Sequence, residues 1–79
     1  MPVFYFHLLD DMDVRDPEGI ELPNLTAAQA KARHNARMLM GEMLKDEAHI
    51  NLSHRIDIED EHRRVLDTVW FRDVVRVEG

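Results

Sequence analysis

The stretch that decides the fold is PNLTAAQAKARHNARMLMGEMLK, residues 23–45. Its apolar side chains recur every three or four residues, which is the spacing of one face of an α-helix. The members of this apolar stripe are Leu25, Ala28, Ala32, Ala36, Leu39, Met40 and Met43. The spacing therefore predicts one long amphipathic helix that runs from Leu25 to Lys45.

The start of this helix and one interior position carry further signals. Asn24 is one candidate N-cap, and Thr26 with Gln29 three residues later is another, in the pattern of a capping box. Gly41 costs the helix about 1 kcal/mol relative to alanine. Gly41 either permits the close approach of another backbone or is simply tolerated, and we favour tolerance.

The segment before the helix predicts a first β-hairpin. Residues 3–9, VFYFHLL, are rich in aromatic and β-branched side chains, which favours a strand. The acidic residues within 10–13 are typical of a turn. Residues 14–16 then predict a short return strand, which ends at Pro17 because proline has no N–H to donate. Gly19 permits a sharp bend before the chain reaches the helix.

The segment after the helix predicts a second hairpin. Residues 55–59, RIDIE, alternate strictly, so both isoleucines should face inward from a half-exposed strand. Residues 60–63 are polar enough for a turn, and residues 65–71 supply the second strand. Residues 71–75 have apolar side chains at i, i+3 and i+4, which predicts a last helical turn.

The order hairpin, helix, hairpin predicts one α+β domain, residues 1–79, with ββαββ topology. Short connections favour antiparallel pairing, so we expect a four-stranded, mostly antiparallel sheet with the helix on one face. Residues 3–9 carry apolar side chains on both faces, so this strand is either central or covered on its second face by another chain. The two faces carry Phe4, Phe6 and Leu8 on one side and Val3, Tyr5, His7 and Leu9 on the other.

Length and composition argue against a disulfide-linked, a thiolate-zinc and a membrane-spanning protein. With 79 residues, the chain has a small core, and oligomerisation is one way to add stability. The sequence has no cysteine, which excludes disulfides and thiolate-bound zinc. The apolar segment 3–9 is too short to span a bilayer, and no basic region precedes it, so we expect a cytoplasmic protein without a membrane contact.

No group of residues predicts catalysis. His7 lies in a predicted strand, where a lone histidine is usually a structural hydrogen-bonding residue. A catalytic role would need a nucleophile or a carboxylate positioned beside it. Thr26, Ser53 and Thr68 are the only hydroxyl residues of the serine and threonine type, and none lies in a nucleophile motif. We therefore predict no enzyme.

Metal and cofactor motifs also fail. The spacing Asp11-x-Asp13 suggests a calcium loop, but the following ligand positions hold unsuitable residues, so a solvated acidic turn is the better interpretation. The histidines after the helix lack zinc spacing. These residues are His49, His54 and His62. We predict no metal and no cofactor.

Several segments together form a recognisable pattern: residues 1–2 (MP), 4–7 (FYFH), 10–11 (DD), 18–25 (EGIELPNL), 27–30 (AAQA), 55–61 (RIDIEDE) and 68–71 (TVWF). In these segments the chain resembles a family of short bacterial proteins catalogued as a domain of unknown function. The family often has aspartate at the position of Asn24, glycine near Arg63 and proline at the position of Trp70. The resemblance supports the fold and implies no activity.

Two candidate interaction surfaces remain. Basic side chains gather in the first half of the helix, where they form either a solvated face or a docking surface for an anionic partner. They are Lys31, Arg33, His34 and Arg37. Apolar side chains outside the expected core indicate a self-association surface. They are Tyr5, Met38, Leu44 and Trp70.

These surfaces define the function hypotheses. The first is a non-enzymatic protein-interaction module that forms a homodimer through its apolar surface or a free strand edge. The alternative is a nucleic-acid-associated regulator of the small antitoxin-like kind, which would use the basic half of the helix. A net charge of -6 opposes that alternative, since the overall field repels a phosphate backbone.

Overall fold

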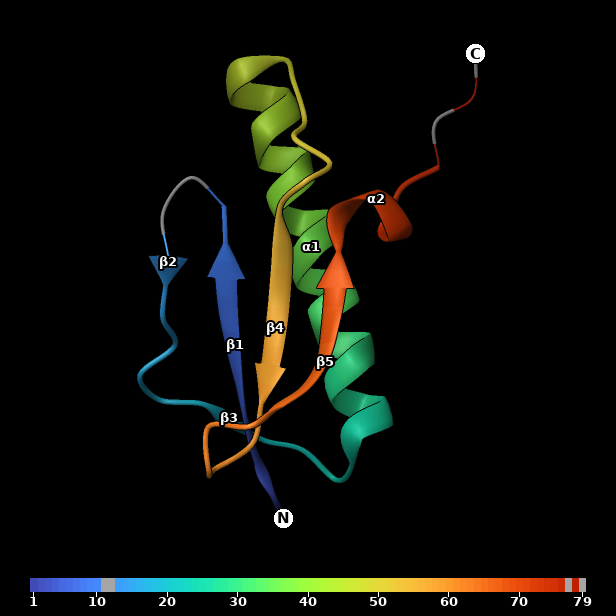
Figure 1. Ribbon diagram of the computed structural model, residues 1–79. Helices are drawn as coiled ribbons and strands as arrows, with labels where there is room; N and C mark the ends of the chain where they lie inside the picture. Colours follow the sequence, from blue (N-terminus) through green and yellow to red (C-terminus); the bar gives the residue numbers. More distant parts are fainter. Residues whose placement is uncertain (11–12, 77, 79) are drawn as a thin grey trace.

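The computed structural model describes residues 1–10, 13–76 and 78, and it contains one long helix on one face of an antiparallel sheet (Figure 1). The predicted α+β fold is confirmed. The elements are β1 (Val3–Leu9), β2 (Asp13–Val14), β3 (Ile20–Glu21), α1 (Leu25–Glu47), β4 (Arg55–Glu59), β5 (Val65–Trp70) and α2 (Phe71–Val74). Two residues of the predicted acidic turn, Asp11 and Met12, lie outside the described residues.

The sheet has the strand order β2-β1-β4-β5, and β3 also pairs with β1. Pairing of β1 with β4 is antiparallel, with Tyr5 opposite Glu59 and Leu9 opposite Arg55. The strands β4 and β5 form an antiparallel hairpin, whose pairing register shifts between Ile58 and Glu59. The first strand is therefore central, which confirms one of the two alternatives that its apolar faces left open.

The return strand of the first hairpin is divided in two, and the strand predicted over 14–16 is wrong at Arg15 and Asp16, which lie outside β2. Asp16 does not continue β2. Its carboxylate instead accepts hydrogen bonds from the backbone N–H groups of Phe6 (3.2 Å), Glu18 (3.1 Å) and Gly19 (3.1 Å). Gly19 has φ +71°, and a Cβ there would lie 2.7 Å from Cγ1 of Val3, so this bend requires glycine.

The helix α1 begins where the sequence predicts and extends two residues beyond Lys45. Asn24 is the N-cap, and its side-chain oxygen accepts from the N–H of Ala27 at 2.9 Å. The capping box of Thr26 and Gln29 is wrong. The Gln29 side chain instead donates to Oδ2 of Asp67 at 2.8 Å, because a tertiary partner on β5 is within reach.

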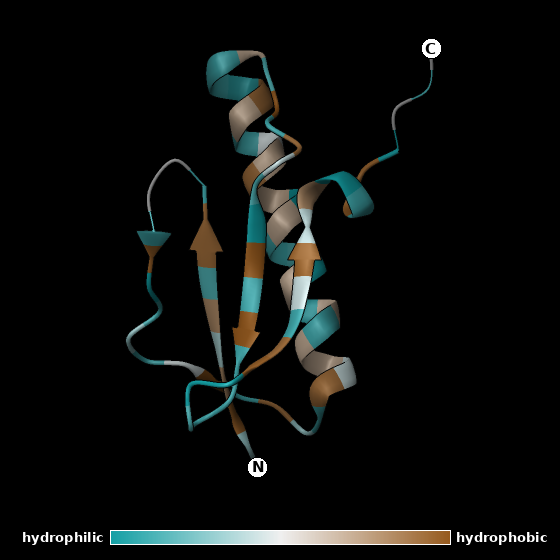
Figure 2. Ribbon diagram, viewed as in Figure 1, coloured by the Kyte–Doolittle hydropathy of each residue, from teal (hydrophilic) through white to brown (hydrophobic). Residues whose placement is uncertain are grey.

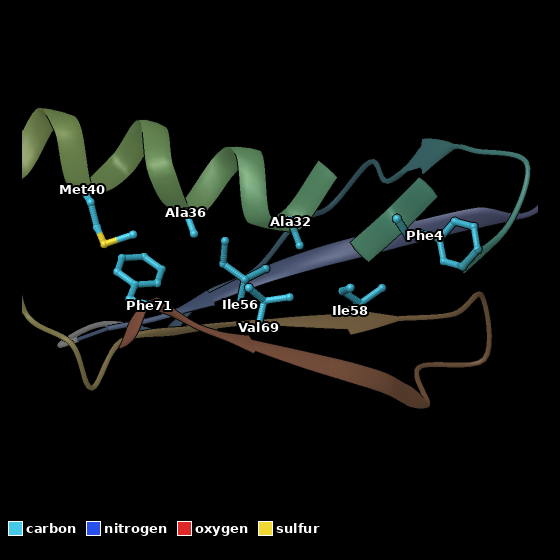
Figure 3. Packing of buried hydrophobic residues seen from close by; sticks show 9 residues of the cluster. Phe4, Ala32, Ala36, Met40, Ile56, Ile58, Val69 and Phe71 are labelled. Carbon is cyan, nitrogen blue, oxygen red and sulfur yellow. The ribbon is translucent and has the colours of Figure 1, made fainter. Parts of the chain in front are cut away.

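The core lies between α1 and the strands β4 and β5 (Figure 3). On the helix, Ala28, Ala32 and Ala36 are fully buried, and their small side chains let the helix approach the sheet closely. Ile56, Ile58 and Val69 face them from the sheet. Phe4, Met40 and Phe71 complete the buried cluster. The predicted apolar stripe and the inward isoleucines are confirmed.

Three details of the second hairpin differ from expectation or refine it. Arg63 adopts φ +65°, in the left-handed region that glycine favours. The strand β5 ends at Trp70, and the predicted last turn is the short helix α2. The outward side of β4 is less exposed than predicted, because Glu59 is buried beside His7 and Arg15.

Within the described residues, no helix combines the length and apolar character needed to cross a membrane.

Candidate interaction surface

The helix α1 covers only part of the inner face of the sheet, the face that carries Ile56 and Ile58. It packs on β4 and β5, and β1 and β2 extend to one side of it (Figure 1). Leu8 pairs with Ile56 and Phe6 pairs with Ile58, so these two β1 side chains share the inner face. Both are only half-buried. Apolar surface of β1 is therefore left open beside the helix, and part of the β1 ribbon has the brown colour of hydrophobic residues in Figure 2.

Two adjoining grooves occupy the space between α1 and β1. The first has a volume of about 500 Å³, and its lining residues are Phe6, Leu8, Lys31, His34, Asn35, Met38, Leu39 and Ile56. The second has a volume of about 190 Å³, and its lining residues are Leu8, Asp10, Leu39, Glu42, Met43, Asp46 and Glu47. Because Leu8 and Leu39 line both, the grooves form one continuous depression, called here the α1–β1 trough.

The middle of the trough is apolar and accessible. Met38, on its helix side, is 57% exposed. Val14 of β2 is 48% exposed and lies opposite Leu8 in the sheet register, so it extends the apolar face beyond β1. A contiguous exposed apolar patch is a common feature of sites that bind another molecule, so the middle of the trough is a candidate interaction site.

The two ends of the trough carry opposite charge. The cation Lys31 lines one end, next to the imidazole of His34, and the carboxylates of Glu42, Asp46 and Glu47 line the other. At 1.5 Å of rise per residue, the span from Lys31 to Asp46 is roughly 22 Å. This distance exceeds the screening length of about 8 Å at physiological salt, so each end presents its own charge to a partner.

The structure divides the predicted anionic-partner surface. Lys31 and His34 line the trough. Arg33 instead lines a groove of about 240 Å³ on the opposite flank of α1, where Asp67 and Asp73 also lie. Arg37 is exposed on the helix. The four basic side chains therefore do not form a single surface.

The structure also separates the predicted self-association residues. Met38 lines the trough. Leu44 is 52% exposed on the helix, and it is not among the described residues that line the two grooves of the trough. Tyr5 and Trp70 lie on the outer face of the sheet, since their strand neighbours face inward. Arg63 stacks over the Tyr5 ring at 4.8 Å, and Trp70 holds two arginines of its own chain, Arg55 at 5.2 Å and Arg72 at 4.6 Å.

His7 lies in a buried polar cluster on that outer face. Its Nδ1 accepts from the N–H of Asp16 at 3.0 Å, and an amide can only donate, so Nδ1 carries no proton. Nε2 lies 3.1 Å from Oε1 of Glu59 but is not aligned with it as a hydrogen bond. Oε2 of Glu59 is 3.4 Å from Arg15. His7 therefore connects β1 to the connecting segment that holds Asp16 and to β4, where the buried carboxylate of Glu59 lies beside its ring.

The histidines after the helix are dispersed. His49 contacts Glu47, and His62 lies in the turn of the second hairpin. His54 is buried, and its ring meets the edge of Phe71 with 5.7 Å between centroids. In the described part of the chain, no group of three or more histidine, aspartate or glutamate side chains is arranged to hold a metal ion.

Sequence reasoning missed the β1 wall and the acidic end of the trough. Phe6 and Leu8 belong to the face predicted as core, and only the position of the helix shows that they stay open. The acidic end had a signal in the sequence, because Glu42, Asp46 and Glu47 make the second half of the helix acidic while the first half is basic. That reversal of charge along one helix could have been noticed.

Comparison with known proteins gives one match. A family model described as Domain of unknown function (DUF6894) matches residues 3–72. No curated protein and no solved structure matches the chain. The resemblance drawn from the sequence, to a family catalogued as a domain of unknown function, is confirmed.

Proposed function

This chain belongs to the family DUF6894, a domain of unknown function, and we propose that it is a cytoplasmic, non-enzymatic interaction module that self-associates through the α1–β1 trough. The observation that carries this proposal is the open apolar centre of the trough, where Met38 is 57% exposed beside half-buried Phe6 and Leu8. A chain without cysteine is suited to a reducing cytosol.

The physical driving force is burial of this apolar surface. Each Å² of apolar surface removed from water contributes about 25 cal/mol, so covering several large side chains offsets the entropy lost on association. Methionine is suited to such a surface, because its flexible side chain adapts to the shape of a partner. A domain of this size also gains proportionally more from association than a larger one does.

The polar groups support a binding role rather than a chemical one. The charged side chains of the trough lie at its ends, away from the apolar centre. The buried pair of His7 and Glu59 lies on the other face of the sheet, and His7 uses Nδ1 to accept from the backbone of Asp16. A histidine engaged in this way holds the strands together.

The alternative, a nucleic-acid-associated regulator, has weaker support. Phosphate backbones are bound by clustered cations, whereas Lys31 and Arg33 lie on opposite flanks of α1. Arg33 also lies beside Asp67 and Asp73, whose carboxylates would repel a phosphate. Retention on single- or double-stranded DNA or RNA at low salt, lost steeply as salt rises, would favour this alternative.

A matched pair of variants tests the proposal. Met38→Glu and Leu44→Glu each place a carboxylate at a well-exposed apolar position of the same helix, but only Met38 lines the trough. Burying an unpaired charge at an interface costs about 3 kcal/mol or more, so Met38→Glu should weaken self-association by roughly 100-fold. Leu44→Glu should change it by less than about threefold. Analytical ultracentrifugation over a wide concentration range measures both.

Three results would contradict the proposal. A wild-type protein that stays monomeric at high concentration removes self-association altogether. A dimer that survives Met38→Glu but not Leu44→Glu places the contact at the end of the helix. A dimer that survives both but dissociates on Trp70→Ala places it on the outer face of the sheet, where Trp70 lies.

A further inference from the structure

We propose that the second copy lies antiparallel across the trough, so that the basic end of each chain faces the acidic end of the other. This inference rests on the self-association proposed above and specifies its geometry. The two-fold axis passes the helix at Met38 and Leu39, the apolar centre of the trough. The interface is then formed by the same surface on both chains.

The first argument is that four of the polar side chains at the two ends have no partner among the described residues of the chain. Among the described residues, Lys31, His34, Glu42 and Asp46 form no side-chain ion pair or hydrogen bond with one another or with any other residue. Of the acidic end, Glu47 has an exposed contact with His49 at 3.6 Å. Four charged or polar side chains around one apolar surface are therefore available to a partner.

The second argument comes from symmetry. A two-fold contact places each residue against a position related to it by the axis. A parallel arrangement of the two helices would bring Lys31 against Lys31 and Asp46 against Asp46, which is unfavourable because like charges repel. Only the antiparallel arrangement brings unlike charges together, and it does so twice in each dimer.

The third argument is that two polar pairs, the charge pair of Lys31 with Asp46 and the pair of His34 with Glu42, place the axis within half a residue of each other. The midpoint between Lys31 and Asp46 falls between Met38 and Leu39, and the midpoint between His34 and Glu42 falls at Met38 itself. Both pairs therefore form when the exposed Met38 of one chain packs on Met38 of the other. The register that pairs the charges is also the register that buries the most exposed apolar side chain of the trough.

The charge pattern also selects a second copy over other occupants. An acidic peptide would be attracted to the end with Lys31 and His34 but repelled by the carboxylates at the other end. A basic peptide would be attracted to those carboxylates but repelled by Lys31. A second copy of the chain matches both ends at once. Lys45 is exposed on the same helix, but the described residues that line the two grooves do not include it.

A charge-swap experiment tests this arrangement. The first variant, Lys31→Glu with His34→Glu, makes both ends acidic, and the second, Glu42→Lys with Asp46→Lys, makes both ends basic. Each variant alone should dimerise at least roughly tenfold more weakly than wild type at low salt, since both of its contacts join like charges. An equimolar mixture should restore association as a heterodimer. Native mass spectrometry, with one variant carrying a mass tag, measures the fraction of heterodimer.

The mixture also serves as a folding control, because two misfolded variants would not recover a defined heterodimer. The changes also follow the helix dipole, with acids toward the N-terminus and bases toward the C-terminus, so α1 should persist. Arg33→Glu is the matched control: it reverses a charge of the same helix on the flank away from the trough, and it should leave dimerisation within about twofold of wild type.

Three outcomes would overturn the arrangement while leaving self-association intact. In the first, wild type dimerises and both charge variants dimerise equally well. In the second, both variants are monomeric and their mixture is monomeric too. A monomeric wild type would instead remove the self-association on which the arrangement rests. A mixture of strictly statistical composition, with homodimers as abundant as expected at random, would also contradict the pairing of opposite ends.

Discussion

The two halves of the inner sheet face have similar side chains and different surroundings. Under α1, Ile58 of β4 is fully buried and Val69 of β5 is nearly so. Beside α1, Phe6 and Leu8 of β1 are half-buried, and Val14 of β2 is 48% exposed. The first half is a conventional core, whereas the second half has an apolar surface with no covering element in the described part of the chain.

The dimensions of the elements explain this difference. A helix with its side chains is about 10 Å wide, and neighbouring strands lie about 4.8 Å apart. One helix therefore covers about two strands of a sheet that is four strands wide, since β2 and β3 both pair with β1. The alanines at positions 28, 32 and 36 fix which two, because their small side chains fit closely over β4 and β5. An apolar face in the sequence thus predicts which side of a strand points inward, but not whether anything covers it.

The largest expected effect separates the two halves by stability. Ile58→Ala removes a fully buried side chain and leaves a cavity, which should lower the free energy of unfolding by about 3 kcal/mol. Leu8→Ala removes a half-buried side chain from the open half, and it should cost about 1 kcal/mol. Urea denaturation at a protein concentration low enough to favour monomer measures both changes.

The same pair of variants gives a second readout at high concentration. If the trough binds a second copy, the cost of Leu8→Ala should rise with protein concentration, whereas the cost of Ile58→Ala should not. Equal costs for the two variants in the monomer would show that the open half is packed as tightly as the covered half.

Much of the fold was predictable because it depends on short-range patterns. The helical period predicted α1 to within two residues, and the alternation of 55–59 predicted β4 and its inward isoleucines. The division between β2 and β3 was not predictable. It depends on the carboxylate of Asp16, which turns back onto the N–H of Phe6, and no local pattern distinguishes that turn from a continuing strand.

The candidate surface was predictable only in pieces. Met38 was recognised from its position on the helix, outside the apolar stripe, and Lys31 and His34 from their charge. Their meeting beside Leu8 depends on where α1 settles across the sheet, which is decided by packing between distant segments. Sequence periodicity fixes the direction of each side chain from its own element and says little about such distances.

A smaller effect on stability is expected from the polar contacts at the edge of the open half of the sheet face. There the carboxylate of Asp16 accepts hydrogen bonds from backbone N–H groups, including that of Phe6 in β1. Burial raises the pKa of Asp16, but hydrogen bonds from the backbone N–H groups of Gly19, Phe6 and Glu18 outweigh it, so the pKa lies below the ordinary 3.8. The folded state therefore favours the carboxylate. This stabilisation is complete above the unfolded-state pKa and is lost as the pH falls through the lower folded-state value.

Asp16→Asn should accordingly destabilise the protein by about 1–2 kcal/mol at neutral pH, because one carboxylate oxygen becomes an NH₂ group that cannot accept. The difference from wild type should shrink as the pH falls below about 4. Asp13→Asn is the control, since the side chain of Asp13 is half-exposed and, among the described residues, forms an ion pair with the exposed Arg15, and it should change stability by less than about 0.5 kcal/mol. Denaturation curves for Asp16→Asn and wild type that run parallel across this pH range would contradict the assignment.

The smallest expected change in stability is at Gly41, a helix position that packs against neither half of the inner sheet face. A Cβ added at Gly41 would have no atom within 4 Å, so Gly41→Ala changes helix propensity without changing packing on the sheet. We expect the free energy of unfolding to rise by about 0.5–1 kcal/mol, measured by urea denaturation. Because Gly41 does not line the trough, dimerisation measured by ultracentrifugation should stay unchanged. A stabilised monomer with weakened self-association would mean instead that a second backbone approaches this glycine, and the contact between copies would have to lie on the exposed back of α1.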